Sequence, residues 1–156
     1  MEKSRKGLFS CLSIILFSIL LHSCSVPKIV VLEDPLSAEE HNDLGVVYEK
    51  KGMLSLAERE YEKAVNKKPN WDVPYFNLGN LYYKKGDYQK AIQFYKKAVK
   101  INPDNSDALN NMAYLYYLLG DYQKAYYYIK KAISKKMKRE YIQTMKEIEE
   151  KIYESD

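Results

Sequence analysis

The sequence predicts an all-α fold, a stack of three helix-turn-helix repeats followed by one further helix. A spacing of 34 residues separates Gly52, Gly86 and Gly120. The same spacing relates three alanines that would give each second helix a small face: Ala57, Ala91 and Ala125. Because one such unit cannot bury its apolar face alone, three in succession are the minimum for a self-supporting stack.

The amino-terminal segment, residues 1–23, predicts a secretion signal rather than a membrane-spanning helix. A short basic stretch with Lys3 and Arg5 precedes an apolar run, Leu8–Leu21, of 14 residues. A spanning helix needs about 20 apolar residues. A charged start before a short apolar region is typical of a signal peptide.

The end of this segment, LHSC at 21–24, resembles the bacterial lipoprotein signal, in which an aliphatic residue and small residues precede an acylated cysteine. The resemblance implies lipidation of Cys24 and no other cofactor. Of the two cysteines, Cys11 would be removed, so acylation also accounts for the remaining thiol. By the same resemblance, Ser25 implies the outer membrane, facing the periplasm, in a cell with two membranes. Otherwise we expect the outer face of the cytoplasmic membrane.

Residues 24–37 are expected to form the acylated start and a tether, because they show no helical period and contain Pro27 and Pro35. Fully extended, such a stretch reaches about 45 Å. Its apolar patch, Ile29–Leu32, would lie along a helix face, pair with a partner strand, or serve only as linker.

The repeats are expected at residues 38–71, 72–105 and 106–139. Ser37 is a plausible N-cap for the first helix, with Glu40 as the reciprocal residue of a capping box. The turn glycines would end each first helix in a left-handed conformation.

Two further features of the repeats have physical reasons. Gly45 and Gly79, with Ala113 in the third repeat, are small where the first helix approaches its neighbour. Pro69 and Pro103 would stop the second helix before the next repeat begins.

The pattern is clearest in the middle unit, whose spine is Tyr75, Leu78, Gly79, Tyr82, Gly86, Asp87, Tyr88, Ala91, Tyr95, Ala98 and Pro103. It resembles the tetratricopeptide repeat, and the resemblance covers residues 38–139. That family implies a right-handed solenoid that binds other proteins. The resemblance also puts eight tyrosines in the core: Tyr48, Tyr61, Tyr75, Tyr82, Tyr88, Tyr95, Tyr116 and Tyr122.

The last segment, residues 140–153, predicts a capping helix. Tyr141, Met145, Ile148 and Ile152 recur at spacings of 4, 3 and 4, which forms one apolar seam. A polar-backed helix of this kind covers the last apolar face of a repeat array.

The candidate partner-binding groove follows from the resemblance, in which the inner faces of the first helices line a groove. The second and third repeats would project Phe76, Asn77, Asn80, Tyr83, Lys84, Asn110, Asn111, Tyr114 and Tyr117, and the first would project Asn42, Val46, Glu49 and Lys50. Amides can bond a peptide backbone, and aromatic rings form pockets for its side chains. We therefore expect an extended or helical peptide segment of another envelope protein. A chaperone C-terminal carboxylate is not expected, because Asp107 and Asn111 stand where that clamp has cations.

A basic patch near the end of the third repeat offers an alternative function. It consists of Lys130, Lys131, Lys135, Lys136, Lys138 and Arg139. It would bind a cell-wall or surface polymer or anionic head groups, or it would only complement a helix end on a solvated face.

Composition excludes other classes of function. The net charge of +4 is spread over mixed charges, which argues against nucleic acid. The two histidines, His22 and His41, form no cluster with cysteine, so we expect no catalytic site, no metal and no enzyme.

The sequence thus predicts a lipid-anchored interaction scaffold of the cell envelope. Pilus or secretin assembly and recruitment of cell-wall enzymes are the processes that similar lipoproteins serve. A small accessory subunit of a larger enzyme is a further alternative.

Overall fold

The computed structural model describes residues 34–155. The expected signal peptide, Cys24, Ser25 and the tether up to residue 33 lie outside this part. The described residues form helices and no strand. The helices are α2 (Ala38–Lys50), α3 (Leu54–Lys67), α4 (Asp72–Lys84), α5 (Tyr88–Ile101), α6 (Ser106–Leu118), α7 (Tyr122–Lys135) and α8 (Arg139–Ser155). The all-α prediction is confirmed.

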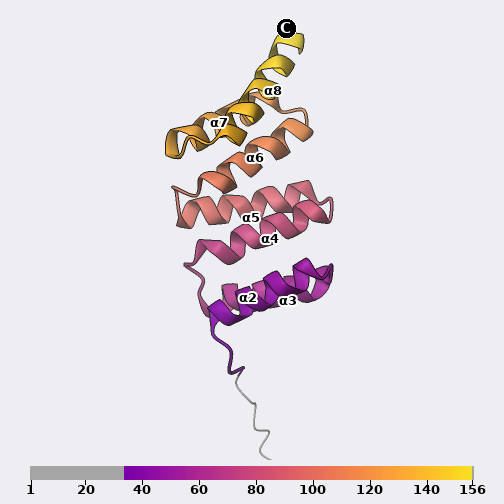
Figure 1. Cartoon of the computed structure of the whole chain (residues 1–156), viewed down its shortest axis with the longest axis vertical. Coiled ribbons are helices and arrows are strands. Elements are labelled where there is room, and N and C mark those ends of the chain that lie inside the picture. The colour runs from indigo at the N-terminus through magenta and orange to yellow at the C-terminus, as the bar shows by residue number, and fades with distance from the viewer. Residues whose placement is uncertain (1–33, 156) are drawn as a thin grey trace, which may run out of the picture. The chain divides into compact units, whose positions relative to one another are not determined.

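The helices form three antiparallel pairs, α2–α3, α4–α5 and α6–α7, which stack in chain order (Figure 1). The last helix, α8, packs against α7 and α6. Neighbouring pairs touch through the second helix of one and the first helix of the next. Each repeat therefore contacts mainly its neighbours, as expected of a solenoid.

The helix ends follow the predicted signals. The Ser37 hydroxyl accepts from the Glu40 amide at 3.1 Å, and Glu40 Oε2 accepts from the Ser37 amide at 2.7 Å, which completes the capping box. Between the helices of each pair, Gly52, Gly86 and Gly120 have φ of 74°, 79° and 76°. A residue with a Cβ would be strained there, so glycine ends the first helix of every repeat.

The close approach within each pair depends on a residue pair 16 positions apart. A Cβ built on Gly45 would lie 2.5 Å from Tyr61 Cε1, and one on Gly79 would lie 2.4 Å from Tyr95 Cε1. In the third repeat the glycine is Ala113 and the tyrosine position holds Ile129, both fully buried. The shorter isoleucine leaves room for the extra methyl group. The small residue and the side chain opposite it therefore change together.

The prediction that all eight repeat-position tyrosines are core residues was wrong for half of them. Tyr61, Tyr82, Tyr95 and Tyr116 are buried, but four others are only partly buried: Tyr48, Tyr75, Tyr88 and Tyr122. Tyr48, Tyr75 and Tyr88 pack against the core from its edge, whereas the Tyr122 ring lies against Tyr117.

The final helix, α8, is longer than the expected 140–153. It buries Tyr141 and Ile148, and Met145 and Ile152 pack against the core. The Tyr141 hydroxyl donates to Asp107 Oδ1 at 2.5 Å. This polar contact fixes α8 on α6 beside the apolar seam.

Candidate functional site

A central hollow of about 250 Å³ lies among α2, α4, α5 and α6. Its lining residues are Glu49, Asn80, Tyr83, Lys84, Tyr95, Asn111, Tyr114 and Leu115. Five of the nine predicted groove residues line it together: Asn80, Tyr83, Lys84, Asn111 and Tyr114. The first helices supply most of the lining, because their equivalent faces point the same way in each repeat.

A hydrogen-bond network holds the wall of the central hollow. The Tyr95 hydroxyl donates to Asn80 Oδ1 at 2.6 Å. Asn111 Nδ2 donates to the same oxygen at 3.1 Å and contacts the Tyr95 hydroxyl at 3.2 Å. Burial raises the pKa of Tyr95 above its ordinary value, so its hydroxyl stays protonated. Asn80 keeps its Nδ2 hydrogens unpaired among the described residues, and they are available to a ligand carbonyl.

The charges in the central hollow neutralise each other. Lys84 Nζ lies 2.6 Å from Glu49 Oε1, and the Tyr61 hydroxyl donates to Glu49 Oε2 at 2.7 Å. Both carboxylate oxygens are thus engaged. The hollow presents neutral amides and rings with one internal ion pair.

A row of tyrosines borders the central hollow. Tyr83 meets Tyr114 edge-on at 6.2 Å, and Tyr114 stacks with Tyr117 at 6.3 Å between ring centroids. Tyr88 and Tyr122 extend the row at its two ends, at 5.9 and 5.8 Å. Tyr83 and Tyr114 are 38% and 36% exposed, so the row offers accessible aromatic area. We call these five residues the aromatic row.

Besides Tyr117, which belongs to the aromatic row, three predicted groove residues do not line the hollow: Phe76, Asn77 and Asn110. Phe76 packs 5.8 Å from the Tyr95 ring, and Asn77 Nδ2 donates to Asn42 Oδ1 at 2.8 Å. Asn110 Oδ1 is buried and accepts no hydrogen bond from the described residues. Conversely, sequence reasoning assigned Tyr95 only to the core and did not include Leu115. The signal for Tyr95 was its hydroxyl, since a buried tyrosine usually needs a partner for that group.

The predicted basic patch does not form one set. Lys135 pairs with Asp104 at 2.8 Å, and Lys138 pairs with Asp107 at 2.5 Å. Burial alone would raise the pKa of Asp107, but hydrogen bonds from Lys138 and Tyr141 hold it below its ordinary value. Lys130 lies instead on the surface of α7, away from these pairs. The patch therefore divides into neutralised and unpaired cations.

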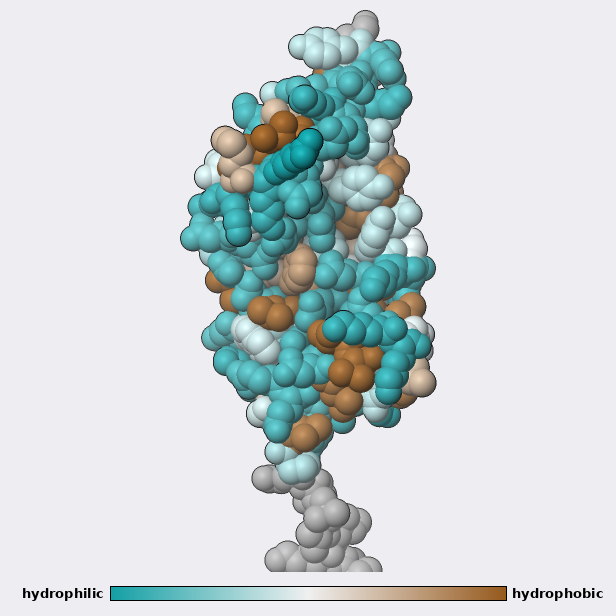
Figure 2. All heavy atoms as spheres, viewed as in Figure 1, coloured by the Kyte–Doolittle hydropathy of each residue, from teal (hydrophilic) through white to brown (hydrophobic). Residues whose placement is uncertain are grey.

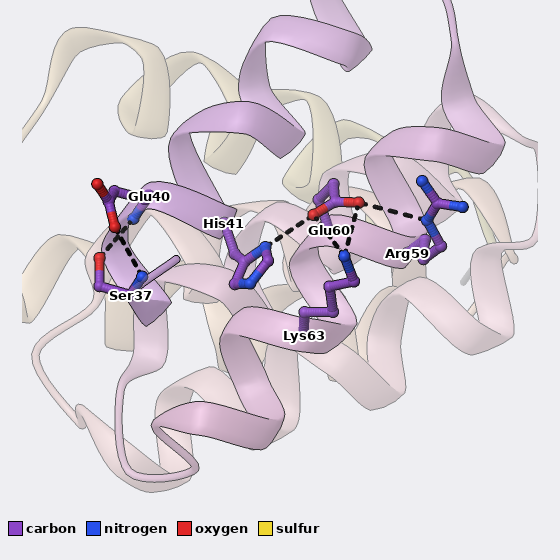
Figure 3. A network of polar contacts seen from close by, with 6 residues as sticks. All are labelled: Ser37, Glu40, His41, Arg59, Glu60 and Lys63. Carbon is purple, nitrogen blue, oxygen red and sulfur yellow. Dashed lines mark hydrogen bonds and ion pairs between the residues drawn. The ribbon is translucent and has the colours of Figure 1, made fainter. Parts of the chain in front are cut away.

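A buried hydrogen bond between His41 and Glu60 in the first repeat is the centre of a second cluster of titratable groups (Figure 3). His41 Nδ1 lies 2.7 Å from Glu60 Oε2, and both side chains are almost fully buried. Lys63 and Arg59 approach the same carboxylate at 3.3 Å each. Burial would raise the pKa of Glu60, but these contacts, first among them the one with His41, hold it below its ordinary value. The pair joins α2 to α3 in the interior of the first repeat.

The remaining features of residues 34–155 concern metal ions and membranes. In this part of the chain no group of three or more His, Cys, Asp or Glu side chains is arranged to hold a metal ion. None of the described helices combines the length and apolarity that a membrane crossing requires.

The fold and the site define a helical-repeat protein of the binding-module class. Its features are stacked helix pairs, a small residue at each close approach and a hollow lined mainly by first helices. Tetratricopeptide repeat models match residues 73–105, 94–127 and 41–70. Together these matches span more than half of the chain. The chain belongs to the tetratricopeptide repeat family.

Solved structures show the same fold. The tetratricopeptide domain of Sgt2 from Aspergillus fumigatus is 19% identical, with a TM-score of 0.71 over 76% of this chain and 80% of that one. The first such domain of Spaghetti (RPAP3), bound to the HSP90 peptide SRMEEVD, is 18% identical, with a TM-score of 0.72 over 77% and 96%. The N-terminal domain of stress-induced protein-1 from C. elegans is 22% identical, with a TM-score of 0.66 over 72% and 94%. Among curated protein sequences, no significant match was found.

Proposed function

We propose that this chain is an interaction adaptor of the bacterial cell envelope that binds a peptide segment of a partner protein in the central hollow. The observation that carries this proposal is the meeting of unpaired amide donors on Asn80 with the exposed rings of Tyr83 and Tyr114. Amides bond a peptide backbone, while the rings give its side chains apolar contact. A tetratricopeptide domain of similar fold, that of Spaghetti, binds a peptide of HSP90.

The ligand in this proposal is an uncharged or aromatic segment rather than an acidic C-terminus. The only cation lining the hollow, Lys84, is already paired with Glu49. Binding an acidic group there would break that pair and leave Glu49 beside the new charge. A ligand with aliphatic or aromatic side chains meets no such cost.

Crosslinking in cells tests the groove. A photoreactive residue placed at Tyr83 of the full chain should capture a partner, whereas one at Tyr127, which is 59% exposed outside the hollow, should not. Tyr83→Ala with Tyr117→Ala should abolish co-purification of the crosslinked partner while far-UV circular dichroism stays unchanged. Co-purification of the same partner with this double variant would sink the proposal.

The finer part of the proposal is lipid anchoring at Cys24, which gives the adaptor its place in the envelope. Dual acylation gives stable membrane attachment. Cys24→Ser should release the protein from membranes or leave an uncut precursor, and Cys11→Ser is the matched control that should change neither. Ser25→Asp should redirect the protein to the inner membrane of a cell with two membranes. Equal fractionation of all variants would contradict anchoring at Cys24.

A further inference from the structure

Cations are separated from anions by helix in this protein. The second helices α5 and α7 carry four lysines each and contain no aspartate or glutamate. By contrast, α3 mixes Glu58, Glu60 and Glu62 with its cations. The near-neutral composition of the chain therefore conceals a strongly basic surface.

Three adjoining hollows run across α5 and α7, with volumes of about 540, 320 and 570 Å³. The first and second share Lys100, and the second and third share Tyr127 and Lys131. The hollows thus adjoin one another across α5 and α7, and we call this run of hollows the lysine trough. Its cations are Lys96, Lys97, Lys100, Lys130 and Lys131. The face shown in Figure 2 is mainly hydrophilic, with hydrophobic residues in separate spots rather than one band.

The cations of the lysine trough have no carboxylate to neutralise them. No aspartate or glutamate is among the residues that line the three hollows. None of the five lysines forms an ion pair within residues 34–155, whereas Lys124 and Lys135 of the same helix α7 pair with Asp121 and Asp104. Several ammonium groups rest on aromatic rings instead, as Lys130 does on Tyr126 at 5.3 Å. Such contacts position a cation but leave its charge in place.

We propose that the lysine trough binds an acidic polysaccharide. The elongated run of hollows fits a linear chain, and its unpaired lysines complement repeated anionic groups. Neutral polar side chains lie between the lysines, namely Asn70, Gln123 and Ser134, and these suit sugar hydroxyls. Tyr127, 59% exposed, offers a flat surface against which the apolar face of a sugar ring packs.

The aromatic rings favour a polysaccharide over a single-stranded nucleic acid. Sequence-tolerant binding of nucleic acid uses successive open rings on which bases stack. Here Tyr128 already stacks on Tyr116 at 5.4 Å, and Lys130 and Lys97 lie over Tyr126 and Tyr75. Tyr127 is the only tyrosine of the trough that is mostly exposed. A lipid bilayer matches less well, because its anionic groups are spread over a plane, whereas the lysines follow a linear run of hollows.

Binding of polygalacturonate oligomers to the full chain tests this proposal, with neutral dextran as the uncharged probe. We expect polygalacturonate to bind, with an affinity that falls as salt increases, and dextran not to bind. Lys100→Glu with Lys131→Glu should weaken binding by about tenfold or more at 0.1 M salt. Lys51→Glu with Lys146→Glu makes the same change of charge at exposed positions outside the trough and should weaken binding about twofold or less.

Each other outcome decides the question. The assignment would be overturned if the two double variants lost equal affinity. It would also be overturned if single-stranded oligo-dT or phosphatidylglycerol vesicles bound more tightly than polygalacturonate. If the charge-reversed variant does not fold, Lys100→Gln with Lys131→Gln replaces it. Amide shifts of the wild-type chain then decide: polygalacturonate should shift the amides of Lys100 and Lys131 in the trough and leave those of Asn80 and Tyr114 in the central hollow unchanged, and the reverse pattern would refute the trough.

Discussion

In the central hollow the single ammonium group, that of Lys84, lies 2.6 Å from Glu49, whereas the five lysines of the trough have no carboxylate among the residues lining it. The two regions are nevertheless built from the same repeats. First helices supply most of the hollow, and second helices supply most of the trough. Tyr95 and Lys97 lie on the same helix α5, but about 200° apart around its axis.

This difference teaches that one repeat pattern can present two kinds of surface. In the central hollow, short hydrogen bonds and paired charges fix the side chains before a ligand arrives, so recognition depends on shape and on the amides. In the lysine trough the attraction is electrostatic and long-ranged, and added salt weakens it. Variants that affect one region and spare the other should therefore be obtainable.

The largest effect is expected from Gly79→Ala, which breaks the central hollow. The new Cβ would lie 2.4 Å from Tyr95 Cε1 and displace that ring. Overpacking of about 3 kcal/mol, less about 1 kcal/mol gained in helix propensity, should lower the free energy of unfolding by about 2 kcal/mol. Urea denaturation of the wild type and the variant measures this change in the free energy of unfolding.

The third repeat supplies the control for this prediction. Gly79→Ala combined with Tyr95→Ile copies the pair Ala113 and Ile129 and should recover about half of the lost stability, because it relieves the overpacking but also deletes the Tyr95 bond to Asn80. If the single variant were as stable as the wild type, the close approach of α4 and α5 would not limit residue size at this position.

The left-handed turn within each helix pair was predictable, because a glycine that recurs at a fixed spacing indicates a backbone conformation that other residues avoid. A glycine repeated every 34 residues at 52, 86 and 120 indicated a left-handed turn, and the structure has that turn in every repeat. The ring that fills the space opposite Gly79 was not predictable from the same pattern, because it depends on side-chain direction across two helices. The exchange of Gly-Tyr for Ala-Ile at positions 113 and 129 was the available signal.

The candidate site was predictable only in part. Helical spacing placed Asn80, Tyr83 and Asn111 on equivalent faces, and the structure brings them to one hollow. Spacing could not show that Lys84 is neutralised by Glu49, 35 residues away. The lysine trough was predicted only in part, because Lys130 and Lys131 belong to the expected basic patch. Lys96, Lys97 and Lys100 were missed because charge was balanced over the whole chain, whereas the absence of acidic residues from 88–101 and 122–135 could be read directly.

Tyr95→Phe tests the hollow with a smaller change. Removing the hydroxyl deletes its bond to Asn80 and should cost about 1 kcal/mol in the free energy of unfolding. It should also reduce partner capture from position 83 without changing polysaccharide binding. Tyr127→Phe is the matched control and should leave stability within about 0.5 kcal/mol, because that tyrosine is mostly exposed. Equal losses in the two variants would show that the Tyr95 network does not hold the hollow.

Acid should weaken the contact between α6 and α8, because Asp107 loses its charge at low pH while the lysines keep theirs. The pKa of Asp107 is held below its ordinary value, so its bonds to Lys138 and Tyr141 stabilise the fold above the ordinary aspartate pKa of about 3.9. That contribution is lost as the pH falls through the lower folded value. Asp107→Asn should thus flatten the acid limb of stability measured by thermal unfolding between about pH 5 and pH 2. If Asp107→Asn lost stability at low pH as steeply as the wild type, the contact of α6 with α8 would not contribute to acid unfolding.

The smallest effect is expected from Lys100→Gln, which removes one cation of the lysine trough. Lys96 and Lys100 are four residues apart on α5 with no acid between them, and like charges at this spacing repel by a few tenths of a kcal/mol. The variant should therefore be as stable as the wild type or slightly more stable, by about 0.3 kcal/mol, and the gain should disappear in 1 M salt. Lys135→Gln, which removes a lysine already paired with Asp104, should give no such gain. Lys100 lies in the last turn of α5, where the helix dipole favours a cation by about 0.5 kcal/mol. A loss of stability larger than this on removing Lys100 would show that its cation is neutralised in the folded chain, and the trough would then lack the surplus charge that distinguishes it from the hollow.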